Sequence, residues 1–443
     1  MSAAPISVVI VTLDRAESLR RTLASLRFQR YPEFEVVVVN GPSADHTEAV
    51  LQSFPEVVAC SCPVANLSRA RNIGLAAARG EFVAFVDDDA LPEFGWLDEM
   101  IAGFDHPTVC AVGGLVLDHT GMAYQYKFSA VSRLGRTMHR NDEPFDDQCF
   151  PGSFCVPYVQ GTNAMFRAAA LRSSGGFDET YEYFHDETDL CLRLSNDGWR
   201  IRQLSCGVVH HKSAPSEMRS QERVVTNLFP IVKNTAYFAC RHAAGYRSRA
   251  EILTSLDSYA AHWVNDLRRN AAAGRIDATL GETAATTAAE ALAVGVAMAA
   301  DGPRLGAFDQ LGTAPIRLFN AVMPPCARRF VVIAPDLAAF AASPPANDAE
   351  VRVLVPAESI STVELEHGVW VHRLHGASFA AAVTEELRRI GEWDAEYEVA
   401  VHRGLGDDFI TGAPATGLGA GATHDQPGTI AEPWRLAGRL PHR

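Results

Sequence analysis

Short apolar runs alternate with amphipathic stretches along the first half of the chain. Residues 6–11, 34–39 and 82–86 are almost wholly apolar, which is typical of central strands in a parallel sheet. Between the first two runs, Leu19, Leu23 and Leu26 place one apolar stripe on a predicted helix, and another helix is predicted over residues 69–79. This strand–helix alternation predicts an α/β fold, with a parallel sheet covered by helices on both faces.

Polar residues mark where these predicted helices start. Asp14 and Glu17 stand three residues apart, in the arrangement of a capping box, so the first helix is expected to begin at Asp14. Ser68 is expected to cap the helix over residues 69–79, and Gly80 to end it.

The pattern changes after about residue 215. Apolar residues at helical spacing predict helices over 222–237, 249–270 and 282–300. Beyond Pro324 and Pro325, apolar runs at 330–333 and 351–355 and a helical pattern at 379–390 indicate α/β structure again. We therefore expect an α/β domain over 1–215, a helical extension over 216–302, a small α/β accessory region over 303–410 and a disordered tail over 411–443.

Composition narrows the class of protein. The chain has 443 residues, of which 47% are hydrophobic and 21% charged, as in globular proteins. A net charge of −14 without a basic block argues against nucleic acid as a partner. Neither a signal peptide nor a membrane-spanning run is expected. Nine scattered cysteines without zinc-site spacing fit reduced thiols in a cytoplasmic enzyme.

Three consecutive aspartates, Asp87, Asp88 and Asp89, follow the apolar run 82–86. Ligands of open α/β sheets bind at the carboxyl ends of the strands. From an extended backbone Asp87 and Asp89 would point the same way, so they could hold Mg²⁺ or Mn²⁺, and through the cation a diphosphate. The triplet taken alone could equally be a solvated acidic turn.

Several segments together resemble a known family. They are residues 9–12, 38–45, 70–74, 86–89, 161–167, 175–179, 185–190 and 208–211, which include Val86-Asp87-Asp88-Asp89, Gly161-Thr162-Asn163 and His185-Asp186-Glu187-Thr188-Asp189. In order and spacing they resemble the GT-A-fold glycosyltransferases of family 2, the inverting type that uses nucleotide sugars. The resemblance covers roughly residues 5–215, about half of the chain.

The resemblance implies metal-dependent transfer of a sugar from a nucleotide-diphospho-sugar to a hydroxyl. The expected acceptor is a glycan or glycolipid of surface polysaccharide assembly, and peripheral association with a membrane and the oligomeric state stay open. A histidine after the strand predicted at 206–209 would complete the metal site with Asp87 and Asp89. Register favours His211 over His210, and imidazole suits Mn²⁺ better than Mg²⁺.

The resemblance also implies a general base among residues 185–189. The family carries a Glu-Asp pair there, whereas this chain has Asp186-Glu187 in the reverse order. Register gives Glu187 the base position, with Asp186 as the alternative. A carboxyl among other carboxylates and partly shielded from water has a raised pKa, which suits a base. Acidic residues are also favoured in the first turn of a helix, where Asp189 is expected to cap or orient.

Donor contacts are expected along the ends of the first two strands. The candidates for the nucleotide are Thr12, Asp14, Asn40, Asp45 and Arg71, with a structural or minor role for Asp88. The family usually has an aspartate at the position of Asn40, so the nucleotide stays open. Arg71 could counter phosphate charge or be an exposed helix residue.

The floor of the sugar and acceptor site is expected to contain Gly161, Thr162 and Asn163. Three aromatic residues in the following loop, Tyr181, Tyr183 and Phe184, could stack on a sugar or simply pack within the loop.

Three other functions are less consistent with these residues. A sugar-1-phosphate nucleotidyltransferase would need a glycine-rich phosphate loop after the first strand, which Leu13-Asp14-Arg15 is not. A dehydrogenase would need GxGxxG there. A catalytically silent sugar-nucleotide-binding module stays open because the acid pair is reversed. Residues 365–374 faintly resemble part of a GT-B glycosyltransferase, but we interpret that region as accessory, so a chain ending near Gly302 is expected to stay active if it folds.

Overall fold

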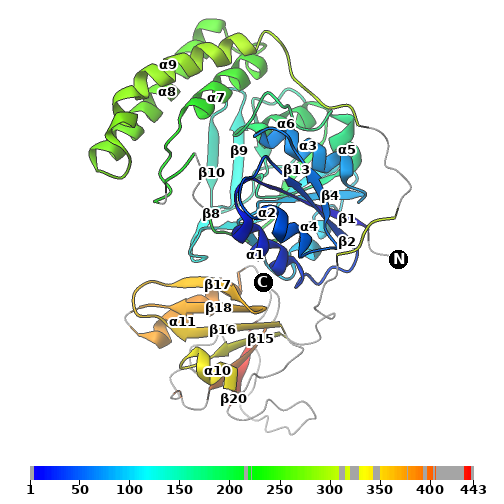
Figure 1. The fold of residues 1–443 in the computed structure, drawn as a ribbon, viewed down its shortest axis with the longest axis vertical. Helices are drawn as coiled ribbons and strands as arrows, with labels where there is room; N and C mark the ends of the chain where they lie inside the picture. Colours follow the sequence, from blue (N-terminus) through cyan, green and yellow to red (C-terminus); the bar gives the residue numbers. More distant parts are fainter. Residues whose placement is uncertain are drawn as a thin grey trace.

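The computed structural model of the protein describes residues 4–213, 218–220, 222–308, 315–319, 329–342, 350–376, 378–392, 397–402, 405 and 434–440. Figure 1 shows an α/β domain in the centre, a helical segment at one end and a second, smaller α/β module at the opposite end. The predicted fold class is therefore confirmed, including the helical and α/β additions to the first domain.

A seven-stranded sheet forms the centre of the first domain, in the order β13-β6-β12-β4-β1-β2-β3. The four strands β3, β2, β1 and β4 run parallel, whereas β12 is antiparallel to both of its neighbours. The strands are β1 (Ile6–Thr12), β2 (Phe34–Asn40), β3 (Val58–Ser61), β4 (Phe82–Val86), β6 (Val109–Gly113), β12 (Asn163–Arg167) and β13 (Arg200–Gln203).

Alternate residues of these strands enter two separate cores, because successive side chains of a strand point to opposite faces. Val8 and Val36 pack in the core with helices α1 (Ala16–Leu26), α2 (Thr47–Gln52) and α4 (Trp96–Ala102). Val9 and Val37 pack in the core with α3 (Leu67–Ala77), α5 (Ala168–Ser173) and α6 (Asp186–Asn196). Burial on both faces explains why the strands are continuous apolar runs.

Two predicted helix starts were wrong. Helix α1 begins at Ala16, because Asp14 has a left-handed backbone (φ 53°) and the Ala16 N–H donates to Asp45 Oδ2 at 2.9 Å. Helix α3 is capped by Asn66, whose side chain accepts from the Arg69 N–H at 2.8 Å. In each helix a side-chain oxygen accepts from a free N–H of the first turn, Asp45 in α1 and Asn66 in α3. The residue spacing in the sequence did not identify either oxygen.

Two small sheets flank the central one. The first has the order β5-β14-β7-β8, formed by β5 (Ala90–Pro92), β14 (Val209–His211), β7 (Val116–Leu117) and β8 (Tyr124–Tyr126). The second has the order β10-β9-β11, formed by β10 (Thr137–Arg140), β9 (Phe128–Ser132) and β11 (Cys155–Tyr158). The aspartate triplet is the link between β4 and β5.

The helical segment contains α7 (Phe229–His242), α8 (Arg249–Ala272) and α9 (Ala278–Met298), and the last two form the long hairpin in Figure 1. The helix expected from residue 222 begins only at Phe229, with Pro230 in its first turn, because Arg219 and Val225 pair as a β-bridge before it. Within the described part of the chain, no helix is both long and apolar enough to cross a membrane.

The C-terminal module is a six-stranded sheet in the order β17-β18-β16-β15-β19-β20. Its elements are β15 (Arg329–Ile333), α10 (Leu337–Ala342), β16 (Glu350–Pro356), β17 (Thr362–Glu366), β18 (Val369–Leu374), α11 (Phe379–Ile390), β19 (Tyr397–His402) and β20 (Trp434–Leu440). Because β20 pairs with β19, residues 434–440 are a strand and not part of a disordered tail. Residues 411–433 of the predicted tail lie outside the described residues.

The segment after α9 returns to the first domain. Phe319 is 2% exposed and packs in the core beside α1, its ring centroid 5.7 Å from that of Phe34. Its N–H donates to Phe34 O at 2.9 Å. A chain ending near Gly302 would lack the Phe319 side chain. We therefore expect the stability of the first domain to depend on residues beyond its predicted end at residue 215.

We predict that Phe319→Ala lowers the free energy of unfolding by about 3 kcal/mol, because it leaves a cavity in a closed core. The neighbouring Leu318 is 50% exposed, so Leu318→Ala should change stability by less than about 0.5 kcal/mol. Chemical denaturation of both variants measures the difference. Equal, small effects would contradict the packing described here.

Candidate active site

Three predicted ligand residues converge at the carboxyl edge of the central sheet. Asp87, Asp89 and His211 each offer one ligand atom, and these atoms lie within 4.8 Å of one another. His211 Nε2 is 3.2 Å from Asp89 Oδ1 and 3.9 Å from Asp87 Oδ2. Two carboxylates and an imidazole are a donor set that fits Mn²⁺. The aspartates converge through a turn, in which the Ala90 N–H donates to Asp87 O at 3.2 Å, and not through the strand alternation that we expected.

The ring of His211 is oriented by a residue that the sequence did not single out. Gln125 Oε1 lies 2.9 Å from His211 Nδ1. Because the amide oxygen only accepts, Nδ1 carries the hydrogen and Nε2 faces the two aspartates. Burial lowers the pKa of His211, but hydrogen bonding to Asp89 and the charges of Asp89 and Asp87 outweigh it and raise that pKa.

Asp88 and Thr12 support the site from beneath. The Thr12 hydroxyl donates to Asp88 Oδ2 at 2.7 Å, and both residues are buried. Arg15 NH1 lies 3.1 Å from Asp88 Oδ1 and 3.0 Å from Asp89 Oδ2. Burial raises the pKa of Asp88 to about 7, although the Arg15 charge opposes this shift. Their side chains therefore hold the aspartate turn, which agrees with the structural role considered for Asp88, and donor contacts of Thr12 and Asp88 stay a prediction.

Arg71 connects the aspartates to the acid pair at the start of α6. Its guanidinium pairs with Asp186 and lies 3.7 Å from Asp87 Oδ1. The residue is 4% exposed, and its guanidinium carbon lies 5.4 Å from the ring centroid of Phe177. Arg71 is thus neither an exposed helix residue nor a freely extended side chain, but a buried charge shared by two carboxylates.

The predicted floor of the site has structural roles. A Cβ on Gly161 would lie 2.5 Å from Arg71 NH2, so glycine leaves room for the guanidinium. Asn163 is fully buried, accepts from Trp96 Nε1 at 2.8 Å and donates to Leu115 O and Gly207 O. Thr162 is also buried. Backbone and indole groups occupy the amide of Asn163, and the expectation that residues 161–163 form the floor of the sugar and acceptor site stays a prediction.

Three predicted nucleotide-binding residues form a turn network after the carboxyl ends of β1 and β2. Asp14 Oδ1 accepts from the Ala44 N–H at 2.6 Å, and Asn40 Oδ1 accepts from the Ser43 hydroxyl at 2.7 Å. Asp45 is exposed and accepts from the Ala16 N–H of α1 and from the Thr47 N–H, the latter at 3.0 Å. Donor contacts of Asp14, Asn40 and Asp45 stay a prediction.

The two acids at the start of α6 differ in environment. Asp186 is buried against Arg71, whereas Glu187 is half-buried. Burial and the neighbouring Asp186 raise the pKa of Glu187 well above its usual range. The two acids thus differ in their contacts, and Glu187 has the raised pKa that suits acid–base work.

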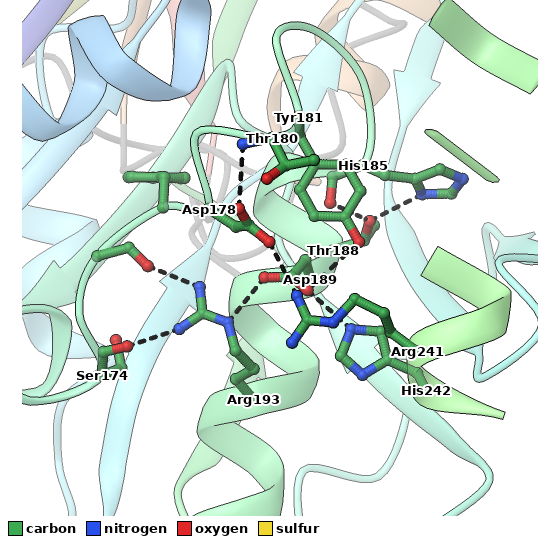
Figure 2. A network of polar contacts seen from close by, with 12 residues as sticks. Ser174, Asp178, Thr180, Tyr181, His185, Thr188, Asp189, Arg193, Arg241 and His242 are labelled. Carbon is green, nitrogen blue, oxygen red and sulfur yellow. Dashed lines mark hydrogen bonds and ion pairs between the residues drawn. The ribbon is translucent and has the colours of Figure 1, made fainter. Parts of the chain in front are cut away.

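Helix α7 holds α6 through a buried polar network (Figure 2). Asp189 accepts from Arg193 Nε and from His242 Nε2, each at 2.7 Å. Burial raises the pKa of Asp189, but Arg193 and His242 outweigh it and lower that pKa. Asp178 accepts from Tyr237 Oη at 2.7 Å and from Arg241 NH1 at 2.9 Å. The helical segment is therefore joined to the site.

The residues just before the acid pair have an unusual backbone. Phe184 and His185 both have φ 72°, a left-handed conformation that costs free energy in residues other than glycine. Asn234 of α7 donates to Phe184 O at 3.1 Å. His185 bonds Thr188 Oγ1 at 2.9 Å and Thr235 Oγ1 at 3.0 Å. These contacts hold the backbone of Phe184 and His185, the two residues that precede α6, in place.

The aromatic residues of this loop do not form an open platform. Tyr181 is fully buried and packs edge-on against Tyr237, with ring centroids 5.0 Å apart. Sugar stacking by Tyr181 is therefore excluded, and the loop-packing alternative is correct for it. Tyr183 and Phe184 are half-buried.

Comparison with known proteins places this domain in a family. Residues 7–174 match the model of Glycosyl transferase family 2. A pre-mycofactocin glycosyltransferase of Mycobacterium tuberculosis is 33% identical over 218 residues, which are 46% of this chain and 42% of that protein. The N-terminal domain of this chain is a GT-A-like α/β domain, and it belongs to glycosyltransferase family 2.

Two further similarities concern other glycosyltransferases. An N-acetylglucosaminyl-diphospho-decaprenol L-rhamnosyltransferase of M. tuberculosis is 28% identical over 46% of this chain and 76% of its own length. Among solved structures, a mannosyltransferase from Pyrobaculum calidifontis in complex with GDP-Man and Mn²⁺ aligns with a TM-score of 0.41 and 17% identity, over 68% of this chain and 88% of that one. This chain spans less than half of the pre-mycofactocin glycosyltransferase.

We predict that the protein loses stability as the pH falls from 7 to 5, partly through His185. Burial lowers the pKa of His185 to about 3, from 6.5. Below pH 6.5 the unfolded chain therefore binds a proton that the folded chain does not, at a cost of up to about 1.4 kcal/mol per pH unit.

Unfolding free energies measured at both pH values should show a smaller loss for His185→Gln than for the parent protein. His262→Gln, at an exposed position of α8, is the matched control and should keep the parent's pH dependence. The same loss in His185→Gln and the parent would contradict the assignment.

Proposed function

We propose that this protein is a divalent-cation-dependent, inverting glycosyltransferase that moves a sugar from a nucleotide-diphospho-sugar to an acceptor hydroxyl. The observation that carries the proposal is the bridge of Arg71 between Asp87 and Asp186. It sets a group of cation ligands beside a pair of acids, and a single displacement needs both a stabilised leaving group and a base in one place. The family of residues 7–174 supports the reaction class.

Asp87, Asp89 and His211 would hold the cation, whose charge would stabilise the departing diphosphate. Arg15 and the buried Asp88 keep the turn that presents these carboxylates. Gln125 keeps Nε2 of His211 turned toward them. The chain's own contribution is thus a preformed set of oxygen and nitrogen ligands at the carboxyl end of β4.

Glu187 suits the role of base better than Asp186. The carboxylate of Asp186 is buried and already engaged by the guanidinium of Arg71, so it is less free to meet an acceptor hydroxyl. Glu187 has a raised pKa, which makes its ionised form a stronger acceptor for the proton of the attacking hydroxyl. Helix α7 holds this turn through Thr235 and Asn234.

The proposed acceptor is a hydroxyl of a glycan or a lipid-linked saccharide. The support is the similarity to the N-acetylglucosaminyl-diphospho-decaprenol L-rhamnosyltransferase of M. tuberculosis, which is named for a lipid-linked sugar. Incubation of the full-length protein with a panel of nucleotide-sugars and Mn²⁺, with and without a chelator, tests the reaction class. Release of nucleoside diphosphate only when the cation is present supports the proposal. Donor binding without any turnover would favour a silent binding module instead.

We predict that Asp89→Asn abolishes cation-dependent nucleotide binding, because a neutral amide is a weaker ligand than a carboxylate. Asp89 also pairs with Arg15, so its substitution could disturb the fold as well as the cation site. Asp87→Asn is therefore a second variant, because the Asp87 side chain is 35% exposed. Titration of a nucleoside diphosphate with and without Mn²⁺ measures the effect. Glu17→Gln, on the exposed side of α1, should bind like the parent. Unchanged binding in both aspartate variants would refute the cation site.

We also predict that Glu187→Gln lowers turnover by roughly 10²–10⁴-fold while nucleotide affinity stays close to that of the parent. For the parent, kcat/KM should rise with pH, because the raised pKa of Glu187 keeps it protonated until the pH exceeds that pKa. Asp186→Asn should disturb Arg71 and so affect donor binding as well. If Asp186→Asn binds the nucleotide normally but has no turnover, while Glu187→Gln keeps its turnover, Asp186 is the base.

A further inference from the structure

Strand β14 presents its two faces to different partners. His211 points toward Asp89, and the preceding residue, His210, lies on the opposite face of the strand. His210 is fully buried, with Nε2 at 2.7 Å from Glu93 Oε1. Its ring stacks on Trp370 of the C-terminal module, with centroids 4.2 Å apart. The strand that carries a candidate cation ligand is thus backed by the C-terminal module.

Arg352 of β16 completes this contact. Its NH1 donates to Glu93 Oε1 at 3.1 Å and its NH2 to Glu93 Oε2 at 2.7 Å. The side chains of Arg352 and Glu93 are 0% and 5% exposed. Glu93 accepts from both Arg352 and His210, so one carboxylate ties the module to the first domain. A paired, bidentate geometry of this kind fixes orientation as well as distance.

Glu93 and the cation ligand Asp89 lie at opposite ends of β5. Val209, His210 and His211 pair with Pro92, Leu91 and Ala90, and the ladder continues because the Lys212 N–H donates to Asp89 O at 2.8 Å. The strands β5 and β14 have three residues each. Such a short pair depends on packing for its order, and the buried side of this pair packs on the module.

Further contacts surround this centre. Leu91 and Phe94 share an apolar cluster with Val363 and Trp370 of the module. Lys212 Nζ donates to Val363 O at 2.7 Å and pairs with Glu364 at 3.0 Å. The interface therefore reaches Lys212, which follows His211, and Leu91 of β5, which lies two residues after Asp89.

We propose that Arg352 is a positioning residue for the cation site, acting through Glu93 and His210 on β14, which carries His211, and on β5, which directly follows Asp89. The inference rests on the proposed function for the identity of the ligands, and goes beyond it by making the C-terminal module part of the site. The module lies outside residues 7–174, which the family model matches. It also revises the expectation that a chain ending near Gly302 keeps its activity.

The test is the affinity of the full-length protein for Mn²⁺ alone, measured by electron paramagnetic resonance. Arg352→Gln leaves the buried Glu93 without its bidentate partner, and we expect affinity to fall about ten-fold. Glu93→Gln combined with Arg352→Gln removes both charges and keeps an acceptor for His210. The double variant should therefore recover affinity to within about two-fold of the parent.

Two more variants separate positioning from general stability. Arg373→Gln breaks the ion pair with Glu366 on the module's half-exposed side and should leave Mn²⁺ affinity unchanged. Trp370→Leu removes the ring stacked on His210 while leaving Arg352 and Glu93 in place, and should weaken Mn²⁺ binding even if Arg352→Gln does not fold.

The outcomes are distinct. Mn²⁺ affinity equal to the parent in folded Arg352→Gln and Trp370→Leu would overturn this inference alone. Loss of affinity that follows melting temperature in every variant, without recovery in the double variant, would overturn it in favour of a purely structural interface. A parent protein that binds no Mn²⁺ would overturn the proposed cation site and this inference together.

Discussion

The candidate site depends on how one buried positive charge, that of Arg71, is balanced by carboxylates. Asp87 and Asp186 approach it from β4 and from α6, which are distant in sequence. Without the guanidinium, carboxylates at the sheet edge would repel one another in a place with little water, and without them the arginine would be an uncompensated buried charge. Gly161 leaves room for the guanidinium, because a Cβ there would clash with it, and the ring of Phe177 lies beside it.

Two additions to the family domain complete this centre from opposite sides. Helix α7 holds the left-handed residues before Asp186 and binds Asp189 through His242. The C-terminal module holds β5 and β14 from behind through Arg352. The acid pair is therefore supported by α7, and the candidate cation ligands by the C-terminal module. Both parts of the chain lie outside residues 7–174, which the family model matches. This arrangement is typical of sites that need ligands held before the substrate arrives.

Much of the fold could be predicted from the sequence, because buried strands and amphipathic helices leave strong periodic patterns. Residues 379–390 form the predicted helix, and the apolar runs at 6–11 and 82–86 are β1 and β4. Asp87 and Asp89 could be found because the aspartate triplet directly follows β4, and His211 because it stands in a motif of the resembled family, although β14 is Val209–His211 and not the strand expected at 206–209. Gln125, Glu93 and Arg352 could not, since their roles depend on contacts between elements far apart in sequence. For the same reason the buried contacts of Asn163 with Trp96 and of Asp88 with Thr12 could not be predicted.

The central claim is that Asp87, Asp89 and His211 hold a divalent cation against a diphosphate, beside the acid pair. The most direct measurement is a crystal structure with Mn²⁺ and a nucleoside diphosphate, in which anomalous scattering locates the manganese. We expect the anomalous peak among these three side chains, with phosphate oxygens completing its coordination. A nucleotide bound with no manganese at this position, or manganese bound elsewhere in the domain, would contradict the account.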